Sequence, residues 1–308
     1  MSSLSLDELI NGANRLLADA GVSPGPDAEI LAARAFDIEV SRLRMQRAIG
    51  TNLSELSNDE AAALELFSSF IERRANREPL QHITGRAHFR TIELRVGPGV
   101  FVPRPETEVL VGIVLDAIAD VESPTIVDLG SGSGAIALSI ASERPDAHVT
   151  AVEGSGAAYP WLRQNAALIA PRVETLHGDF TLVRERMRGT VTVIVSNPPY
   201  VPEGMVPHDP EVRLFDPEAA LYSGRDGLDA IRRISALGLE LAAPSAWIAL
   251  EHAEHQGEQV RAILSGDGWA EATTVQDLTG RDRCTIAKRS RSAAEAVAVD
   301  DPAPGASS

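Results

Sequence analysis

The sequence predicts an α/β protein in which a Rossmann-like domain with a seven-stranded, mostly parallel sheet follows a helical bundle and a β-hairpin linker. Three observations predict this class. The first 80 residues carry helical periodicity only, residues 104–289 alternate strands with helices, and a glycine-rich loop follows the first of those strands. The 308 residues suffice for one large domain and a smaller one.

Residues 1–80 are expected to form a helical domain. The stretch SLDELINGANRLLADAG begins at a Ser/Asp cap and ends at Gly21. A second helix is expected within PGPDAEILAARAFDIE. A third lies within SNDEAAALELFSSFIERRANREP, where Ser57 or Asn58 is the predicted cap and Pro79 ends the helix. The first helix should present one apolar face, made of Leu6, Leu9, Ile10, Ala13, Leu16 and Leu17.

Residues 81–103 are expected to form a β-hairpin linker, because apolar residues alternate there between two glycines. The next domain, residues 104–289, should contain the strands TIVDLG, HVTAVEG, VETLHGD, VTVIVSN, AWIALEH, ATTVQDL and RCTIAKR. Only TGRD separates the last two, which is too short for a parallel crossover, so the seventh strand should run antiparallel. The tail, residues 290–308, is rich in Pro, Ala and Ser and is expected to be disordered.

Composition narrows the function classes. Hydrophobic content of 44% and charged content of 23% are those of an ordinary globular protein. The net charge of −16 argues against direct nucleic-acid binding, because proteins that bind nucleic acids usually display basic surfaces. No apolar run is long enough to span a bilayer, and the N-terminus lacks a signal-peptide pattern, so no membrane association and a cytoplasmic location are expected. No metal site is expected, because Cys284 is the single cysteine and His252 and His255 lack a third ligand.

A glycine-rich loop, IVDLGSGSGAIALSIA, connects the first strand of the sheet to the next helix. Its glycines, Gly130, Gly132 and Gly134, allow a tight turn and a close approach to a ligand. A P-loop would need Lys-Ser/Thr after the last glycine, which is absent. The segment Gly130 to Ala135 loosely fits a dinucleotide fingerprint, whereas the G-x-G-x-G spacing preceded by Asp128 favours an S-adenosyl-L-methionine pocket.

Two further strand ends complete the predicted cofactor site. Glu153 ends the second strand, where a carboxylate can accept hydrogen bonds from both ribose hydroxyls in NAD and S-adenosylmethionine sites alike. Asp179 and Phe180 follow the third strand at the adenine edge, as acceptor and ring cover, or alternatively as a helix cap and a core residue. The expected cofactor-binding residues are Gly130, Ser131, Gly132, Ser133, Gly134, Glu153, Asp179, Phe180 and Asn197.

The fourth strand ends in VIVSNPPY, a corner that is poor in hydrogen-bond donors. Prolines 198 and 199 carry no N–H and restrict the residues before them to extended geometry. The side-chain oxygen of Asn197 and the carbonyl of Pro198 can then act as two fixed acceptors, which suit one planar –NH2 group. Tyr200 offers a ring face to stack on that group. The predicted catalytic residues are Asn197, Pro198 and Tyr200, and Asn197, Pro198, Pro199 and Tyr200 bind the substrate; the alternative is a simple strand-terminating turn.

Two fixed acceptors around one –NH2 group suit methyl transfer to a planar nitrogen. The lone pair of an amide or nucleobase amino group is delocalised, so the nitrogen is a poor nucleophile. Holding both hydrogens favours a pyramidal nitrogen facing the sulfonium methyl, and orientation and preorganised dipoles supply most of the acceleration. The expected product of the cofactor is S-adenosyl-L-homocysteine.

These residues resemble amino-methyltransferases with an Asn/Asp-Pro-Pro-Tyr/Phe motif. Over residues 5–289 the chain is similar to the protein-(glutamine-N5) methyltransferases of class-1 peptide chain release factors, a family of Rossmann-like S-adenosylmethionine-dependent enzymes. The motifs that carry this resemblance are EPLQHITG, FVPRPETE, DLGSGSGAIALSIA, SNPPY, LYSGRDGLDAIRRI and DLTGRDR.

The resemblance implies that the glutamine of a Gly-Gly-Gln loop on a release factor is methylated at its side-chain nitrogen, which modulates translation termination. It also implies that the N-terminal helical domain binds the release factor. Carried over by position, Gly130–Gly134, Glu153, Phe180 and Asn197 contact the cofactor, and Asn197–Tyr200 hold the glutamine amide. The family often has Asp where Glu153 stands and Trp where Phe180 stands.

Three alternatives remain at the level of sequence. The same corner could serve N-methylation of an exocyclic amino group of adenine or guanine in DNA or RNA. An NAD-dependent dehydrogenase and a cofactor-sensing scaffold without activity are the others. In RPETE, Arg104, Pro105 or Glu106 could form a wall near the methionine end of the cofactor, although a helix started by the proline is favoured.

Overall fold

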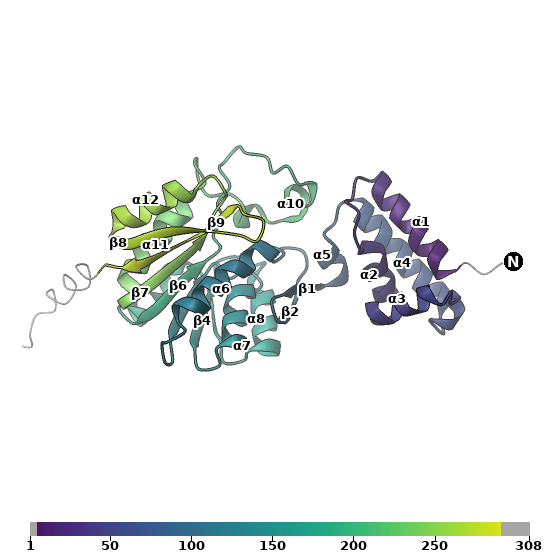
Figure 1. Ribbon diagram of the computed structural model, residues 1–308, viewed down its shortest axis with the longest axis horizontal. Helices are drawn as coiled ribbons and strands as arrows, with labels where there is room; N and C mark the ends of the chain where they lie inside the picture. The colour runs from purple at the N-terminus through teal and green to yellow at the C-terminus, as the bar shows by residue number, and fades with distance from the viewer. Residues whose placement is uncertain (1–4, 291–308) are drawn as a thin grey trace, which may run out of the picture. The chain divides into compact units, whose positions relative to one another are not determined.

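The computed structural model describes residues 5–290, and the chain divides into two compact units (Figure 1). The first contains residues up to Arg86 together with Val206–Phe215; the second contains Ala87–Met205 and the residues from Asp216 onward. Inclusion of Val206–Phe215 in the first unit was not predicted from the sequence. The segment predicted to be disordered, residues 290–308, lies outside the described residues except for Ser290.

The first unit is helical around its own apolar core. Its first helix begins as predicted: Ser5 and Glu8 form a reciprocal capping box. Two details of the prediction were wrong. Leu16 is 59% exposed, because the buried stripe is narrower than the apolar face of the sequence. Asp59 caps the fourth helix by accepting from the Ala62 N–H at 3.0 Å, in place of Ser57 or Asn58. The elements are α1 (Leu6–Asp19), α2 (Asp27–Ala35), α3 (Val40–Ala48), η1 (Leu53–Glu55), α4 (Glu60–Ala75), α5 (Leu80–Thr84) and α10 (Pro210–Phe215).

A buried arginine ties α10 to the other helices of this unit. The Arg74 side chain is 7% exposed; its Nε lies 2.7 Å from Asp27 Oδ2 and its Nη2 lies 2.8 Å from Glu211 Oε1. Arg77 also reaches Glu211, at 3.1 Å. The hydrogen bonds to both carboxylates raise the pKa of Arg74 against the opposing effect of burial.

We expect Arg74→Ala to lower the free energy of unfolding of the helical unit by about 3 kcal/mol, because it removes the arginine paired with the largely buried Asp27 and leaves Glu211 with Arg77 alone. The matched control is Arg44→Ala, which removes a 55% exposed side chain paired with Glu29 and should cost less than about 1 kcal/mol. Urea unfolding of the full-length variants, followed by circular dichroism, measures both. Equal losses would contradict a structural role for the buried ion pair.

The predicted hairpin is present as β1 (Arg86–Phe89) and β2 (Ile92–Arg95), but residues 81–84 of the predicted linker belong to helix α5, so that part of the prediction was wrong. All seven predicted strands of the main sheet are present, in the order β5-β4-β3-β6-β7-β9-β8. Strand β9 runs antiparallel to both of its neighbours, as predicted, and lies between β7 and β8. The strands are β3 (Thr125–Leu129), β4 (His148–Glu153), β5 (Glu174–His177), β6 (Val191–Ser196), β7 (Ala242–Glu251), β8 (Trp269–Gln276) and β9 (Asp282–Arg289).

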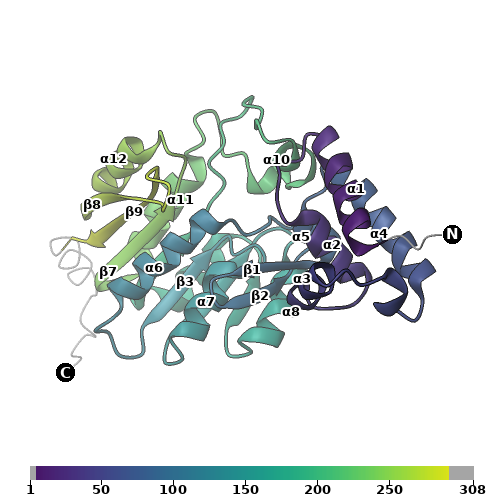
Figure 2. The same ribbon diagram turned by 45° about the vertical axis from the view of Figure 1, so that its right-hand side comes forward.

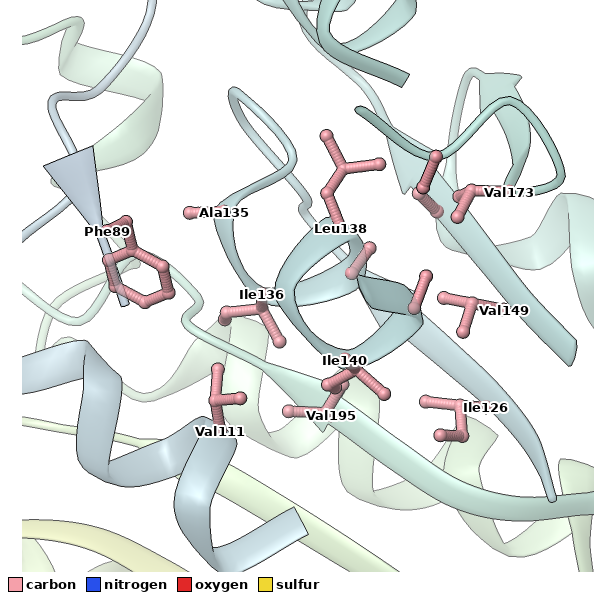
Figure 3. Close-up of a cluster of buried hydrophobic side chains, with 14 of the residues drawn as sticks. Phe89, Val111, Ile126, Ala135, Ile136, Leu138, Ile140, Val149, Val173 and Val195 are labelled. Carbon is pink, nitrogen blue, oxygen red and sulfur yellow. The ribbon is translucent and has the colours of Figure 1, made fainter. Parts of the chain in front are cut away.

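Helices cover both faces of this sheet, and successive strand residues enter two different cores (Figure 2). Ile126 packs with helices α6 to α8 on one face, while Val127 packs with α11 and α12 on the other. Figure 3 shows Ile140 of α7 lying beside Ile126 and Val195 of the sheet. The covering and connecting elements are η2 (Pro105–Thr107), α6 (Glu108–Ala117), α7 (Ala135–Glu143), α8 (Tyr159–Ile169), η3 (Phe180–Val183), α9 (Arg184–Met187), η4 (Glu218–Ala220), α11 (Asp229–Leu241) and α12 (Gly257–Asp267).

Candidate active site

The glycine loop lies between β3 and α7 and has a backbone that favours glycine. Gly130, Gly132 and Gly134 have φ angles of +79°, +56° and +91°. A Cβ at Gly130 would lie 3.9 Å from the ring of Phe180, so the ring lies over bare backbone at that point. Two residues predicted to act together are therefore side by side, although they are 50 positions apart in the chain.

Hydrogen bonds from neighbouring elements fix the loop. The amides of Gly130 and Ser131 donate to the Val152 carbonyl at 2.9 and 3.0 Å. Asn165, fully buried on α8, donates from Nδ2 to the Ser133 carbonyl at 2.9 Å. The same side chain accepts from the Arg95 amide at 2.7 Å, which joins the loop to the hairpin. The loop is thus held in shape by residues on both sides.

Glu153 lies at the end of β4, as predicted, and contacts the loop directly. Its Oε2 accepts from the Gly132 amide at 2.7 Å and its Oε1 accepts from the Ser155 amide at 2.6 Å. The residue is 7% exposed. Each carboxylate oxygen keeps a second lone pair, so a ribose diol can still be accepted beside the loop.

Asp179 and Phe180 have different environments. Asp179 Oδ1 accepts from the Thr181 amide at 3.1 Å and caps η3, and its Oδ2 is 2.6 Å from Arg233. The hydrogen bonds from Thr181 and then Arg233 lower the pKa of this carboxyl. Phe180 packs against the core beside α11, and the Arg233 guanidinium lies 5.7 Å from the centre of its ring. Phe180 therefore faces the glycine loop, while both oxygens of Asp179 already have partners.

Asp128 lies just before the loop and is completely buried. Its Oδ2 accepts from the Ala137 amide at 3.2 Å, and within residues 5–290 its Oδ1 has no hydrogen-bond partner. Burial raises the pKa of this carboxyl to about 7, an effect that the hydrogen bonds from Ser131 and Ala137 only partly oppose. The glycine loop therefore begins next to a buried carboxyl oxygen, Asp128 Oδ1, that has no hydrogen-bond partner within residues 5–290.

The raised pKa of Asp128 predicts a pH-dependent stability. The folded protein holds this proton up to about pH 7, whereas the unfolded chain releases it near its ordinary value of 3.8, so stability falls as pH rises between these values. Asp128→Asn should remove that part of the slope. Urea midpoints at intervals from pH 4 to 8 measure it, and parallel curves for the variant and the wild type would contradict the assignment.

The proline corner begins beside the glycine loop because β6 runs parallel to β3, with Val195 opposite Asp128. Asn197 is the first residue after β6, and its Nδ2 donates to Thr107 Oγ1 at 3.2 Å. Neither Asn197 Oδ1 nor the Pro198 carbonyl accepts a hydrogen bond from another residue in the range 5–290. Both predicted acceptors thus remain available.

The stretch LYSGRDG holds the proline corner in place through backbone hydrogen bonds. Val201 pairs with this stretch through Val201 N–Leu221 O at 2.8 Å and Ser223 N–Val201 O at 3.0 Å. The Tyr200 carbonyl accepts from Gln256 Nε2 at 3.0 Å. Its hydroxyl lies 3.5 Å from Glu251 Oε1, and burial raises the pKa of Tyr200. These contacts fix the backbone and ring of the corner.

Four residues at the site were not predicted from the sequence: Thr107, Asn165, Glu251 and Gln256. Thr107 belongs to RPETE, where the predicted proline-started helix is present as the short 3-10 helix η2, which leads into α6. Glu251 is the last residue of β7, next to β6, so its position at the carboxyl edge of the sheet was the available signal. Within residues 5–290, no group of three His, Cys, Asp or Glu side chains could hold a metal ion. In the same range, no helix is long and apolar enough to cross a bilayer.

The strand order and the position of the loop are those of Rossmann-like methyltransferases. The model of the methyltransferase small domain matches residues 92–217, and that of the PrmC N-terminal domain matches residues 8–85. Among solved structures, the 16S rRNA N2 G1207 methyltransferase of Thermus thermophilus shares the fold, with a TM-score of 0.50 and 20% identity over 67% of this chain and 50% of its own.

The chain belongs to the release factor glutamine methyltransferase family. It is 44% identical over 293 residues to the release factor glutamine methyltransferase of Streptomyces coelicolor, covering 93% of this chain and 99% of the relative. The relatives from Bifidobacterium longum and Corynebacterium glutamicum are 39% and 40% identical, with coverage of 92% and 93% of this chain and 99% of each relative.

Proposed function

We propose that this protein transfers a methyl group from S-adenosyl-L-methionine to the side-chain nitrogen of the glutamine in the Gly-Gly-Gln loop of class-1 peptide chain release factors. The observation that carries the proposal is the pair of available oxygens at Asn197 and Pro198, next to a glycine loop. Relatives of near full-length coverage named release factor glutamine methyltransferase support the same acceptor.

The residues around the loop fit the cofactor. The Phe180 ring lies beside Gly130, 3.9 Å from where a Cβ would stand, and from this position at the loop it would cover an adenine ring. Glu153 would accept from the ribose, and the loop from Gly130 to Gly134 would follow the rest of the molecule. When bound, S-adenosylmethionine supplies an electrophilic methyl group on a sulfonium.

The corner acts on the acceptor nitrogen. Asn197 Oδ1 and the Pro198 carbonyl each accept one N–H of the glutamine amide, and the ring of Tyr200 lies against its plane. This grip turns the nitrogen lone pair toward the methyl group. With S-adenosylmethionine bound, the carbon–nitrogen bond would form as the carbon–sulfur bond breaks, with the bonding pair passing to sulfur. No strong base is needed before attack, because the nitrogen becomes acidic only as it gains positive charge; it would then lose one proton to water.

The helical part, residues 1–80, is proposed to bind the release factor, with residues 81–103 as the linker and residues 104–289 as the catalytic domain. Release factors work in the cytoplasm, and we place the reaction there. Methylation of their Gly-Gly-Gln loop would modulate translation termination.

Offering several acceptors in parallel tests this proposal. The purified protein is incubated with labelled S-adenosylmethionine and, separately, with a release factor, the same factor carrying Gln→Ala in Gly-Gly-Gln, tRNA, rRNA and DNA. We expect label on the unaltered factor alone. Label on nucleic acid and none on the factor would replace the proposal by base methylation.

A further inference from the structure

Asn197 can accept a hydrogen bond from the acceptor amide only if its side-chain oxygen Oδ1, and not its Nδ2, faces that amide. The two ends of an asparagine amide have nearly the same shape but opposite hydrogen-bonding character. With Oδ1 toward the acceptor nitrogen the side chain accepts an N–H. With Nδ2 in that place, two –NH2 groups would face each other. Something in the protein must therefore select the first arrangement.

Thr107 makes this selection at Asn197. Its Oγ1 lies 3.2 Å from Asn197 Nδ2, and the residue is only 4% exposed. A threonine hydroxyl can either donate or accept, so by itself it would tolerate either orientation of the asparagine. The partner that receives the hydroxyl hydrogen decides which role remains.

That partner is Glu251, which is 2% exposed. Burial raises the pKa of this carboxyl to about 7, against the opposing effects of a hydrogen bond from the Thr107 hydroxyl, the positive charge of Arg283 and a hydrogen bond from the Tyr200 hydroxyl, which lies 3.5 Å from Oε1. Above about pH 7 this carboxyl is ionised and can only accept, so it then takes the hydrogen of Thr107. The lone pairs of Thr107 are then left for Asn197 Nδ2.

We infer that Thr107 and Glu251 are positioning residues for Asn197: Glu251 holds the Thr107 hydroxyl hydrogen, Thr107 holds Asn197 Nδ2, and Asn197 Oδ1 is thereby turned toward the acceptor amide. The catalytic meaning of this relay rests on the proposed function. The orientation itself is a property of this chain and can be measured without any substrate.

The orientation is tested by NMR on full-length protein labelled with 15N in asparagine. The side-chain –NH2 pair of Asn197 is assigned by its loss in Asn197→Ala. We expect Thr107→Val, which removes only the hydroxyl, to shift this pair and speed its hydrogen exchange, and Thr107→Ser to restore both. An unchanged pair in Thr107→Val would overturn the inference, whatever the natural acceptor is.

The consequence for turnover is tested on the release factor. Misplacing a reacting group by about 1 Å can cost about a hundredfold. We expect kcat to fall about ten- to a hundredfold in Thr107→Val and Glu251→Gln, with the Kd for S-adenosylmethionine within about twofold of wild type. Thr107→Ser should stay within a few fold. A kcat of wild-type size in a folded Thr107→Val would contradict the positioning role.

The matched control is Thr150→Val, which removes another buried hydroxyl, 3.4 Å from Glu174 and on β4, two strands away from β6, and should leave kcat unchanged. A fall in kcat equal to that of Thr107→Val would contradict a specific role for Thr107. If Thr107→Val does not fold, Thr107→Ser and Glu251→Gln decide by the same two measurements. If wild type methylates no release factor, the proposed function fails, while the NMR result still decides the orientation.

Discussion

Asn197→Ala reduces methyl transfer to the release factor about a hundred- to a thousandfold, the loss typical when one preorganised hydrogen-bonding group is removed from a reacting centre. The variant retains the Pro198 carbonyl but loses the second acceptor, so the acceptor amide can rotate and its lone pair is no longer aimed. Initial rates with labelled S-adenosylmethionine measure the effect.

The fold should survive this substitution, because Asn197 is only half-buried and makes one side-chain hydrogen bond, to Thr107. Thermal unfolding within a few degrees of wild type and retained cofactor binding are the controls. Turnover near the wild-type rate in the folded variant would contradict the mechanism and would revive a reading of the corner as a plain strand-terminating turn.

Gly227→Ala is expected to displace the backbone of the proline corner at Tyr200 and to lower both stability and turnover. Gly227 has a φ of +78°, and a Cβ there would lie 2.3 Å from the Tyr200 carbonyl oxygen and 2.9 Å from Gln256 Nε2. Backbone strain costs about 1–2 kcal/mol and the steric clash about 1–3 kcal/mol more. Because the clash pushes on Tyr200 itself, we expect turnover to fall more than about tenfold as well.

The matched control is Gly189→Ala, which has the same kind of backbone, with φ of +69°, but nothing within 4 Å of its Cβ position. It should lose about 1–2 kcal/mol of stability and no activity. Urea unfolding and kcat, measured on both variants, separate strain from clash. Identical behaviour of the two variants would show that the contact with Tyr200 has no consequence.

The arrangement of the sheet was predictable because its determinants are local. Each strand carries a buried apolar run, each crossover contains a helical pattern, and TGRD is too short for a parallel return, which fixes the direction of β9. The inner and outer faces of helix α1 were less predictable. Leu16 fits the apolar stripe of the sequence, but its exposure depends on how the neighbouring helices pack.

The site was predictable where function depends on backbone geometry. Glycines mark the turn between β3 and α7, and prolines mark the corner after β6, so both could be read from residue type and spacing. The supporting residues could not. Asn165 and Gln256 reach the site from helix α8 and from the N-terminus of α12, and their roles exist only once those helices are packed.

The central claim is that two oxygens hold one planar nitrogen beside the methyl donor. A crystal structure of the protein with S-adenosyl-L-homocysteine and a Gly-Gly-Gln peptide tests it most directly. The account predicts that the glutamine side-chain nitrogen lies about 2.7–3.2 Å from both Asn197 Oδ1 and the Pro198 carbonyl. A bound glutamine with those oxygens turned away from its nitrogen would contradict it.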